Sequence, residues 1–329
     1  MILSNDTITK MKPPYNITAN ILQSVAAIAE KIGEISATHL HRPQAELRKT
    51  NRIKTIQSSL EIEGNILSVE QVTAILENKR VLAPKKDIQE VKNTIEVYNN
   101  IKKMDPFSLS SFLKVHKILM TGLIDSPGKL RGGSVGIVKG SQLAHVAPSG
   151  KMVNPLMNDL FSYLKNNKDM MLIKSCVFHY ELEFIHPFTD GNGRMGRLWQ
   201  TVLLIQQYPV FEFLPVETII KKRQADYYKA LGKSDNAGHS TGFIEFMLQV
   251  LASALEELLA IQHTTLTAAD RVSLFKTTIA DKSFTRKDYL RQFKEISAAT
   301  ASRDLKEAAK KGLLQKQGDK RTSVYKFIG

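Results

Sequence analysis

One twelve-residue segment, His186–Arg197, limits what this chain can fold into more than any other feature. It reads HPFTDGNGRMGR and joins the end of one run with helical apolar spacing to the start of the next. Gly191 and Gly193 let backbone N–H groups approach a ligand closely. A helix that begins near Arg194 offers unpaired N–H groups and the positive end of its dipole. The segment is therefore predicted to be a loop between two helices that holds a polyphosphate.

The side chains of this loop suit transfer chemistry on such a ligand. An imidazole titrates near the working pH and can act as a general base. Arg194 and Arg197 are three residues apart, so they leave one face of the second helix together. Phosphoryl-type transfer needs mainly positioning and charge stabilisation, which N–H groups, arginines and a metal ion provide.

The segment also matches every fixed position of His-Pro-Phe-x-Asp-Gly-Asn-Gly-Arg-x-x-Arg, and in this the chain resembles the Fic-domain proteins. In that family the reaction is adenylylation of a protein, with Mg-ATP as donor. The resemblance implies that His186 takes the proton from a Ser, Thr or Tyr hydroxyl of the target and that Phe188 anchors the loop in the core. It further assigns Asp190 to Mg²⁺ between the α- and β-phosphates, Gly191, Asn192 and Gly193 to an anion hole, and Arg194 and Arg197 to the β- and γ-phosphates.

Other interpretations of the same residues are weaker. A histidine before proline is usually a surface or capping residue, and Gly-Asn-Gly is usually a turn. The Walker pattern GxxxxGK[ST] does not occur in the sequence. A zinc ion held by His179, His186 and Asp190 is the remaining alternative.

An upstream segment, Ser59–Gly64, resembles the Fic inhibitory motif [ST]-x-x-x-E-[GN]. Ser-x-x-x-Glu alone is common on helices as a solvated pair, but here it precedes a full Fic core, on a helix predicted at about 52–64. The resemblance implies that Glu63 pairs with Arg197 and occupies the space of the γ-phosphate, which leaves bound ATP poorly aligned. It also implies that Ser59 hydrogen-bonds near Asn192. The chain is therefore expected to belong to the N-terminally inhibited class.

Two further segments are candidates for binding the target and the adenine. Glycines and alternating residues within Gly128–Pro148 predict a hairpin or extended flap. Fic flaps pair with a target strand, although this sequence departs from their commoner aromatic-glycine pattern, and an ordinary connecting hairpin is the alternative. Tyrosines within Asp226–Leu231 resemble those that border the adenine, unless they simply pack in the core. The candidate residues are Val135, Gly136, Ile137 and Val138 for the flap, and Tyr227 and Tyr228 for the adenine.

The C-terminal residues 282–329 carry 13 Lys/Arg against 5 Asp/Glu, which is most of the excess positive charge of the chain. Their pattern is helix, turn, helix and two-stranded hairpin, and it resembles the winged helix appended to some bacterial Fic proteins. DNA phosphates and a protein partner are both open as ligands. Asp304 and Glu307 are expected to interrupt the basic face. That face comprises Arg303, Lys306, Lys310 and Lys311, with Lys316, Lys320 and Arg321 around the wing.

Composition adds few constraints. The single cysteine, Cys176, excludes an internal disulfide and a cysteine-built zinc site, and it fits a reducing cytoplasm. The first residues lack the pattern of a secretory signal, and no apolar run suggests a membrane span.

The sequence thus predicts a mainly α-helical chain in three parts. These are an N-terminal helical region (1–106), a helical Fic domain with a β-hairpin flap (107–262) and a winged helix-turn-helix (263–329). The expected function is adenylylation of a protein substrate, which could be the chain itself, with ATP and Mg²⁺ as cofactors and inhibition by Glu63. Family analogy also suggests a homodimer. The alternatives are a Fic enzyme that mainly removes AMP and a DNA-binding regulator whose Fic domain senses nucleotide.

Overall fold

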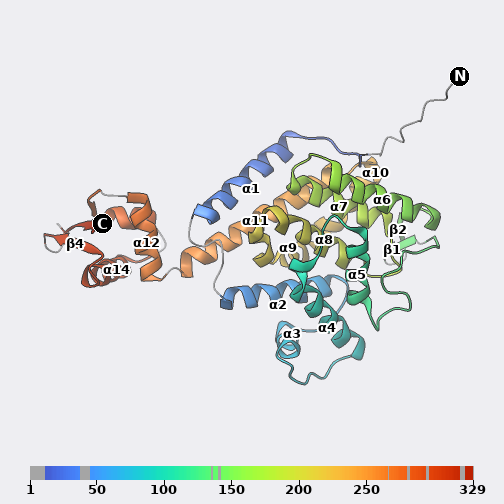
Figure 1. The fold of residues 1–329 in the computed structure, drawn as a ribbon, viewed down its shortest axis with the longest axis horizontal. Helices are drawn as coiled ribbons and strands as arrows, with labels where there is room; N and C mark the ends of the chain where they lie inside the picture. The colour runs from blue at the N-terminus through green and yellow to red at the C-terminus, as the bar shows by residue number, and fades with distance from the viewer. Residues whose placement is uncertain are drawn as a thin grey trace. The chain divides into compact units, whose positions relative to one another are not determined.

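The computed structural model describes residues 12–37, 45–134, 136–139, 142–265, 267–279, 282–293, 296–318 and 323–328. Most of these residues are helical (Figure 1). The chain divides into two compact units. The first comprises Met1–Ile32 and Gln44–Ala254, and the second comprises Gly33–Pro43 and Leu255–Gly329. None of the described helices is both long enough and apolar enough to cross a lipid bilayer.

Up to Thr265, the described residues form helices and one short hairpin, as predicted. The helices are α1 (Ala19–Ala37), α2 (Ala45–Ile62), α3 (Val69–Leu76), α4 (Lys85–Asn99), α5 (Leu109–Met120), α6 (Gly150–Asn166), α7 (Met171–Ile185), α8 (Asn192–Gln207), α9 (Val216–Lys222), α10 (Gln224–Ala237) and α11 (Thr241–Thr265), with 3-10 turns η1 (Ile101–Lys103) and η2 (Pro209–Phe213).

Helices α7 and α8 lie side by side at the centre of the first unit (Figure 1). Both helices are buried on nearly all faces. For α7 the reason is that it is apolar around most of its circumference, and such a helix is stable only when it is enclosed. An aromatic cluster fixes this pair against α5 and α6. Its rings are Phe112, Phe161, Phe178, Phe188 and Trp199.

The predicted hairpin is present as strands β1 (Gly136–Lys139) and β2 (Gln142–Val146). The strands are antiparallel, with Gly136 opposite Val146, and the register shifts between Ile137 and Val138. Val135, a predicted flap residue, lies outside the described residues.

Several helix boundaries differ from what local sequence signals indicate. Asp87 has the residue type of an N-cap, but it lies in the first turn of α4, because that helix already begins after Pro84. Helical spacing over Lys221–Leu231 indicates one helix, whereas the structure has the end of α9 and the start of α10, separated at Arg223. The pattern that follows Thr264 indicates a helix from that residue, but α12 begins only at Ala268, because α11 continues to Thr265.

The second unit packs three helices on a small sheet. Its elements are α12 (Ala268–Ile279), β3 (Phe284–Thr285), α13 (Arg286–Gln292), α14 (Ala298–Lys310), β4 (Leu314–Gln317) and β5 (Val324–Phe327). The strands are antiparallel in the order β3-β5-β4. The core around Phe275, Phe284 and Tyr289 receives Ala301, Leu305 and Ala308 from one face of α14.

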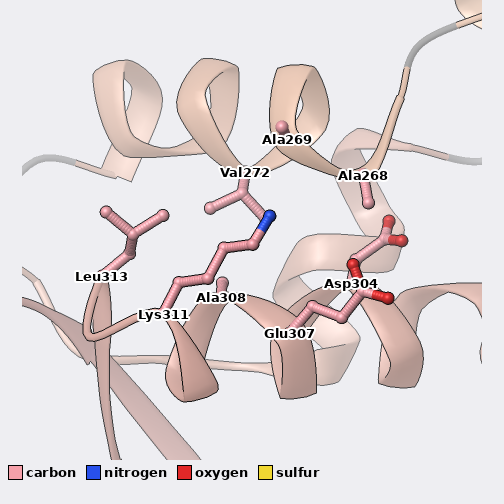
Figure 2. Close-up of a pocket in the computed structure, with 8 residues that line it drawn as sticks. All are labelled: Ala268, Ala269, Val272, Asp304, Glu307, Ala308, Lys311 and Leu313. Carbon is pink, nitrogen blue, oxygen red and sulfur yellow. The ribbon is translucent and has the colours of Figure 1, made fainter.

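Asp304 does not interrupt the basic face of α14, contrary to the sequence prediction. Its side chain is buried and accepts hydrogen bonds from Arg271 at 2.6 and 2.9 Å and from the Tyr289 hydroxyl at 3.2 Å. A pocket beside this pair lies between α12 and α14, with Glu307 and Lys311 among its polar residues (Figure 2). Lys320 and Arg321 lie outside the described residues.

Candidate active site

Hydrogen bonds among its own residues fix the conformation of the loop between α7 and α8. His186 caps α7 in a left-handed conformation (φ 49°), and its N–H donates to the Leu182 carbonyl. Asn192, the first residue of α8, pairs its side chain with the backbone of Phe188 in both directions, each at 2.9 Å. The Asn192 side chain therefore shapes the loop, which leaves its backbone N–H at the helix start for an anion.

Phe188 is fully buried and stacks on Phe112, as expected of a core anchor. His116 of α5, which sequence reasoning missed, also stacks on Phe188, at a centroid distance of 3.5 Å. The Gly128 N–H donates to His116 Nδ1, so Nε2 carries the proton and donates to the Asp190 carbonyl at 3.0 Å. Burial lowers the pKa of His116 to about 4, which keeps this ring neutral.

Arg197 is buried and is bound by the predicted inhibitory segment. Its Nη2 donates to Glu63 Oε1 at 2.7 Å and to the Ser59 carbonyl at 3.0 Å. Its Nε donates to the Ser59 hydroxyl at 3.3 Å. The expected contact of Glu63 with Arg197 is therefore present, whereas the side-chain partner of Ser59 is Arg197 and not Asn192.

The Glu63 carboxylate lies against the first turn of α8. A Cβ atom on Gly193 would come within 2.5 Å of Glu63 Oε1, so only glycine at this position allows the approach. Negative charge is stabilised at a helix N-terminus. The carboxylate thus lies where an anionic ligand of this loop would bind.

Arg194 is the second buried arginine of the site. Its Nη2 lies 3.2 Å from Asp190 Oδ1, and its Nη1 lies 3.3 Å from Glu90 Oε1. Nonetheless, Nε has no hydrogen-bond acceptor among the described residues, and the contact of Nη1 with Glu90 lacks hydrogen-bond geometry. Buried guanidinium donors without acceptors fit a phosphate group.

Asp190 is the exposed carboxylate of the loop. Its side chain is 47% exposed, and its Oδ1 accepts the Gly191 N–H, while Gly191 itself adopts φ 86°. Magnesium typically binds one or two carboxylates together with substrate phosphates. The residues present therefore fit a magnesium–triphosphate ligand.

Glu90 and Asn65 connect the predicted inhibitory segment to Arg194. Asn65, two residues after Glu63, donates its side-chain amide to Glu90 Oε2 at 2.8 Å. Both residues are buried, and Glu90 lies on α4. Sequence reasoning missed this link, although an acidic side chain beside buried apolar positions of α4 was an available signal.

The two predicted adenine tyrosines differ in exposure. Tyr227 is 1% exposed, and its hydroxyl interacts with His179 Nε2 at 3.0 Å and Glu183 Oε1 at 3.4 Å. It packs inside the domain, so only Tyr228, which is partly exposed, can offer its ring to a ligand in this conformation. Burial raises the pKa of Glu183 to about 7.

The zinc alternative conflicts with this network. His179 is fully buried, and its other nitrogen, Nδ1, lies 2.7 Å from Gln200 Oε1. Both ring nitrogens are thus occupied by protein groups. Within the described part of the chain, no three His, Cys, Asp or Glu side chains are grouped to hold a metal.

Comparison with known proteins places this site in a family. The model of the Fic/DOC family matches residues 106–204. A Fic family protein from Desulfovibrio desulfuricans G20, known from a crystal structure, is 40% identical, with 97% of this chain and 99% of that chain covered and a TM-score of 0.74. The chain belongs to the Fic family.

More distant Fic proteins share parts of this chain. "Protein adenylyltransferase Fic" of Aedes aegypti is 30% identical over 242 residues, which covers 69% of this chain and 45% of that protein. The structure of Caenorhabditis elegans Fic-1 (residues 134–508) has a TM-score of 0.62 at 19% identity, over 75% of this chain and 74% of that chain, and shows the fold alone. This Fic protein spans about half the length of the curated relatives it matches.

Proposed function

We propose that this Fic protein transfers AMP from Mg-ATP to a Ser, Thr or Tyr hydroxyl of a protein, with its own chain as one candidate acceptor. The observation that carries the proposal is the anion site at the start of α8, where the Nε of buried Arg194 has no acceptor among the described residues and its Nη1 meets Glu90 only as an ion pair. Homologues named protein adenylyltransferase Fic support the reaction type.

The chain's own residues have distinct roles in this proposal. Arg194, Arg197 and the N–H groups at the start of α8 hold the phosphates, and Asp190 holds the metal ion, which neutralises phosphate charge when bound. His186 takes the proton from the acceptor hydroxyl. The acceptor oxygen then forms a bond to the α-phosphorus, and the bond from that phosphorus to the pyrophosphate breaks. A base of this kind contributes about 10²–10⁴-fold in rate.

The proposal includes autoinhibition by Glu63. Its carboxylate binds Arg197 and lies against Gly193, so a γ-phosphate directed to the same arginine would meet a negative charge. Displacement of the segment after α2 would release Arg197. The hairpin β1–β2 is the proposed binding surface for an extended acceptor segment.

The test is intact-protein mass spectrometry after incubation with Mg-ATP. Wild type, Glu63→Gly and Glu63→Gly/His186→Ala are compared. We expect an AMP-sized mass increment on Glu63→Gly that is lost in the double variant. Equal modification of wild type and Glu63→Gly would contradict autoinhibition, and modification that survives His186→Ala would contradict the assigned base. No increment on any variant would favour AMP removal, which is then tested by release of AMP from a modified protein.

We also propose that the second unit is a winged helix that binds duplex DNA through α14. Three exposed basic side chains, Arg303, Lys306 and Lys310, follow one another at spacings of three and four along the face opposite Leu305. The burial of Asp304 removes one of the two acidic interruptions expected in this face. Glu307 remains exposed beside it. The alternative is that this face binds a protein partner, and the test below distinguishes the two.

The DNA test is fluorescence anisotropy with a labelled duplex over a range of salt concentrations. Arg303→Ala and Lys306→Ala should each weaken binding and reduce the steepness of the salt dependence by about one ion. Glu307→Ala is the matched control and should not weaken binding. Affinity that does not change with salt, or that is unaffected by both basic substitutions, would favour the protein partner.

A further inference from the structure

Arg131 is a buried cation that donates four side-chain hydrogen bonds to described residues, all of them to backbone carbonyls. Nε donates to His186 at 2.7 Å, and Nη2 donates to Ile185 at 2.9 Å and Pro148 at 2.8 Å. Nη1 donates to Gly133 at 2.5 Å. In addition, its backbone N–H donates to the Pro187 carbonyl at 2.9 Å. Three of these five contacts, those to Ile185, His186 and Pro187, join residues more than fifty positions apart.

Two of these carbonyls belong to the end of α7. The last carbonyls of a helix have no partner within the helix, and a cation at that end is stabilised by the helix dipole. Arg131 provides both the donors and the charge. It thereby fixes the peptide groups on either side of the His186 Cα, at a residue with positive φ that tolerates little further distortion.

The other two carbonyls belong to the two ends of the hairpin. Gly133 precedes β1, and Pro148 follows β2. The two ends also touch directly, since a Cβ atom on Gly150 would lie 2.0 Å from the Gly132 carbonyl oxygen. The base of the hairpin is therefore a close-packed point, and Arg131 lies at it with only 5% of its surface exposed.

We infer that Arg131 is a positioning residue that fixes His186 relative to the base of the hairpin. An acceptor segment paired with the hairpin is thereby held at a set distance from the imidazole that takes its proton. This inference rests on the proposed function, in which His186 is the base and the hairpin binds the acceptor. A displacement of about 1 Å between base and acceptor is enough to cost on the order of 10²-fold in rate.

Lysine cannot replace this arginine. The guanidinium is a planar fork with five N–H donors, which suits carbonyls on two different segments. An ammonium concentrates its donors at one nitrogen. Arg131→Lys therefore keeps the charge but loses the hydrogen bonds that join the end of α7 to the base of the hairpin. Arg131→Gln loses both the charge and these bonds.

The experiment uses the full chain with Glu63→Gly as background. Arg131→Lys and Arg131→Gln are compared with the control Lys174→Gln. Lys174 is also a buried cation, lies on α7 and donates to the Leu164 carbonyl. Self-modification is measured at saturating Mg-ATP and as a function of ATP concentration. We expect the saturated rate to fall roughly 10- to 100-fold in both Arg131 variants while the half-saturating ATP concentration is unchanged.

Two results would overturn the inference. One is a saturated rate unchanged by Arg131→Gln. The other is a loss shared by Lys174→Gln, or a loss that comes with a matching rise in half-saturating ATP, because either indicates general destabilisation.

A second readout separates this inference from the proposed function. If Glu63→Gly shows no transfer, the proposed function fails, and amide hydrogen exchange decides the role of Arg131. Exchange should rise in Gly136–Val146 and at the end of α7 in Arg131→Gln but not in Lys174→Gln. Unchanged or uniformly raised exchange would overturn the inference.

Discussion

Each unit of this Fic protein contains a buried arginine paired with a carboxylate, and the two pairs are built differently. In the first unit, Arg197 makes one hydrogen bond to Glu63, whose side chain is 34% exposed. In the second, Arg271 makes two hydrogen bonds to Asp304, whose side chain is 3% exposed. Asp304 accepts a third bond from Tyr289.

The exposure of the carboxylate and the number of its hydrogen bonds indicate which ion pair can be part of a switch. Breaking a fully buried bidentate pair leaves a charge without compensation in a region of low dielectric constant. The Glu63 carboxylate can instead turn towards water, while Arg197 keeps its bonds to Ser59. The first pair is therefore releasable, and the second is a fixed part of a core.

Removing the carboxylate of each pair should change the free energy of unfolding by very different amounts. Asp304→Ala should destabilise the second unit by about 3–5 kcal/mol, because Arg271 is left buried and unpaired. Glu63→Ala should cost less, about 1–2 kcal/mol, because Arg197, although buried, keeps its two bonds to Ser59 and loses only a partly solvated carboxylate. Urea unfolding is followed by circular dichroism and by the fluorescence of Trp199, the only tryptophan, which lies in the first unit. An equal loss in both variants, or a shift of the Trp199 transition by Asp304→Ala, would contradict this distinction.

An intermediate effect is expected at Glu217, a buried carboxylate without an arginine contact among the described residues. It accepts the Tyr98 hydroxyl at 2.8 Å, its Oε2 has no described partner, and burial raises its pKa to about 7. A raised carboxyl pKa means that the native state binds the proton more tightly than the unfolded state. Stability is then greatest below the unfolded pKa and is lost as pH rises towards 7.

Glu217→Gln should therefore be more stable than wild type at pH 8, by about 1–3 kcal/mol, with the gain shrinking towards pH 5. Urea unfolding monitored by Trp199 fluorescence at both pH values measures this. Glu96→Gln, an exposed substitution on α4, is the control. A difference from wild type that does not change with pH would rule out titration of Glu217 as its cause.

The smallest effect concerns how firmly the releasable pair is held. Asn65→Ala removes the hydrogen bond to Glu90, together with the bonds of the same side chain to the Asp87 carbonyl and from the Leu67 N–H, so the segment that carries Glu63 should detach more often. Loss of the bond to Glu90 alone corresponds to about 2- to 10-fold more self-modification with labelled ATP in the otherwise wild-type chain, and this is the smallest rise expected. Asn93→Ala removes a buried asparagine that bonds to the Leu119 and Thr121 carbonyls and should not raise the rate. An equal rise in both variants would indicate general loosening of α4.

Local patterns in the sequence were sufficient for much of this molecule. The breakers around Gly191 placed the loop and the start of α8 to within two residues, and the alternating residues after Gly128 predicted the hairpin. These two are encoded within short windows. The contact of Glu63 with Arg197 spans 134 positions, and it was expected only because the segment resembles the Fic inhibitory motif.

The residues that were missed act across long separations. Arg131 and His116 bind backbone atoms 55 and 74 positions away, and their acceptors are carbonyls present at every residue. No side-chain pattern identifies such contacts before the fold is known. Asp304 differs, since its place beside Ala301, Leu305 and Ala308 on one helix face could have indicated burial.

The missing side chain at Gly193 has a consequence for how nucleotides would be told apart. It leaves one small volume at the start of α8, and the Glu63 carboxylate fills it. Because the competitor is tethered in the same chain, dilution cannot remove it, and its local concentration stays constant. Under the proposed function, a bound nucleoside diphosphate would not enter this volume, whereas the γ-phosphate of a triphosphate would compete with the Glu63 carboxylate for it. Autoinhibition would then act as a sensor of the terminal phosphate.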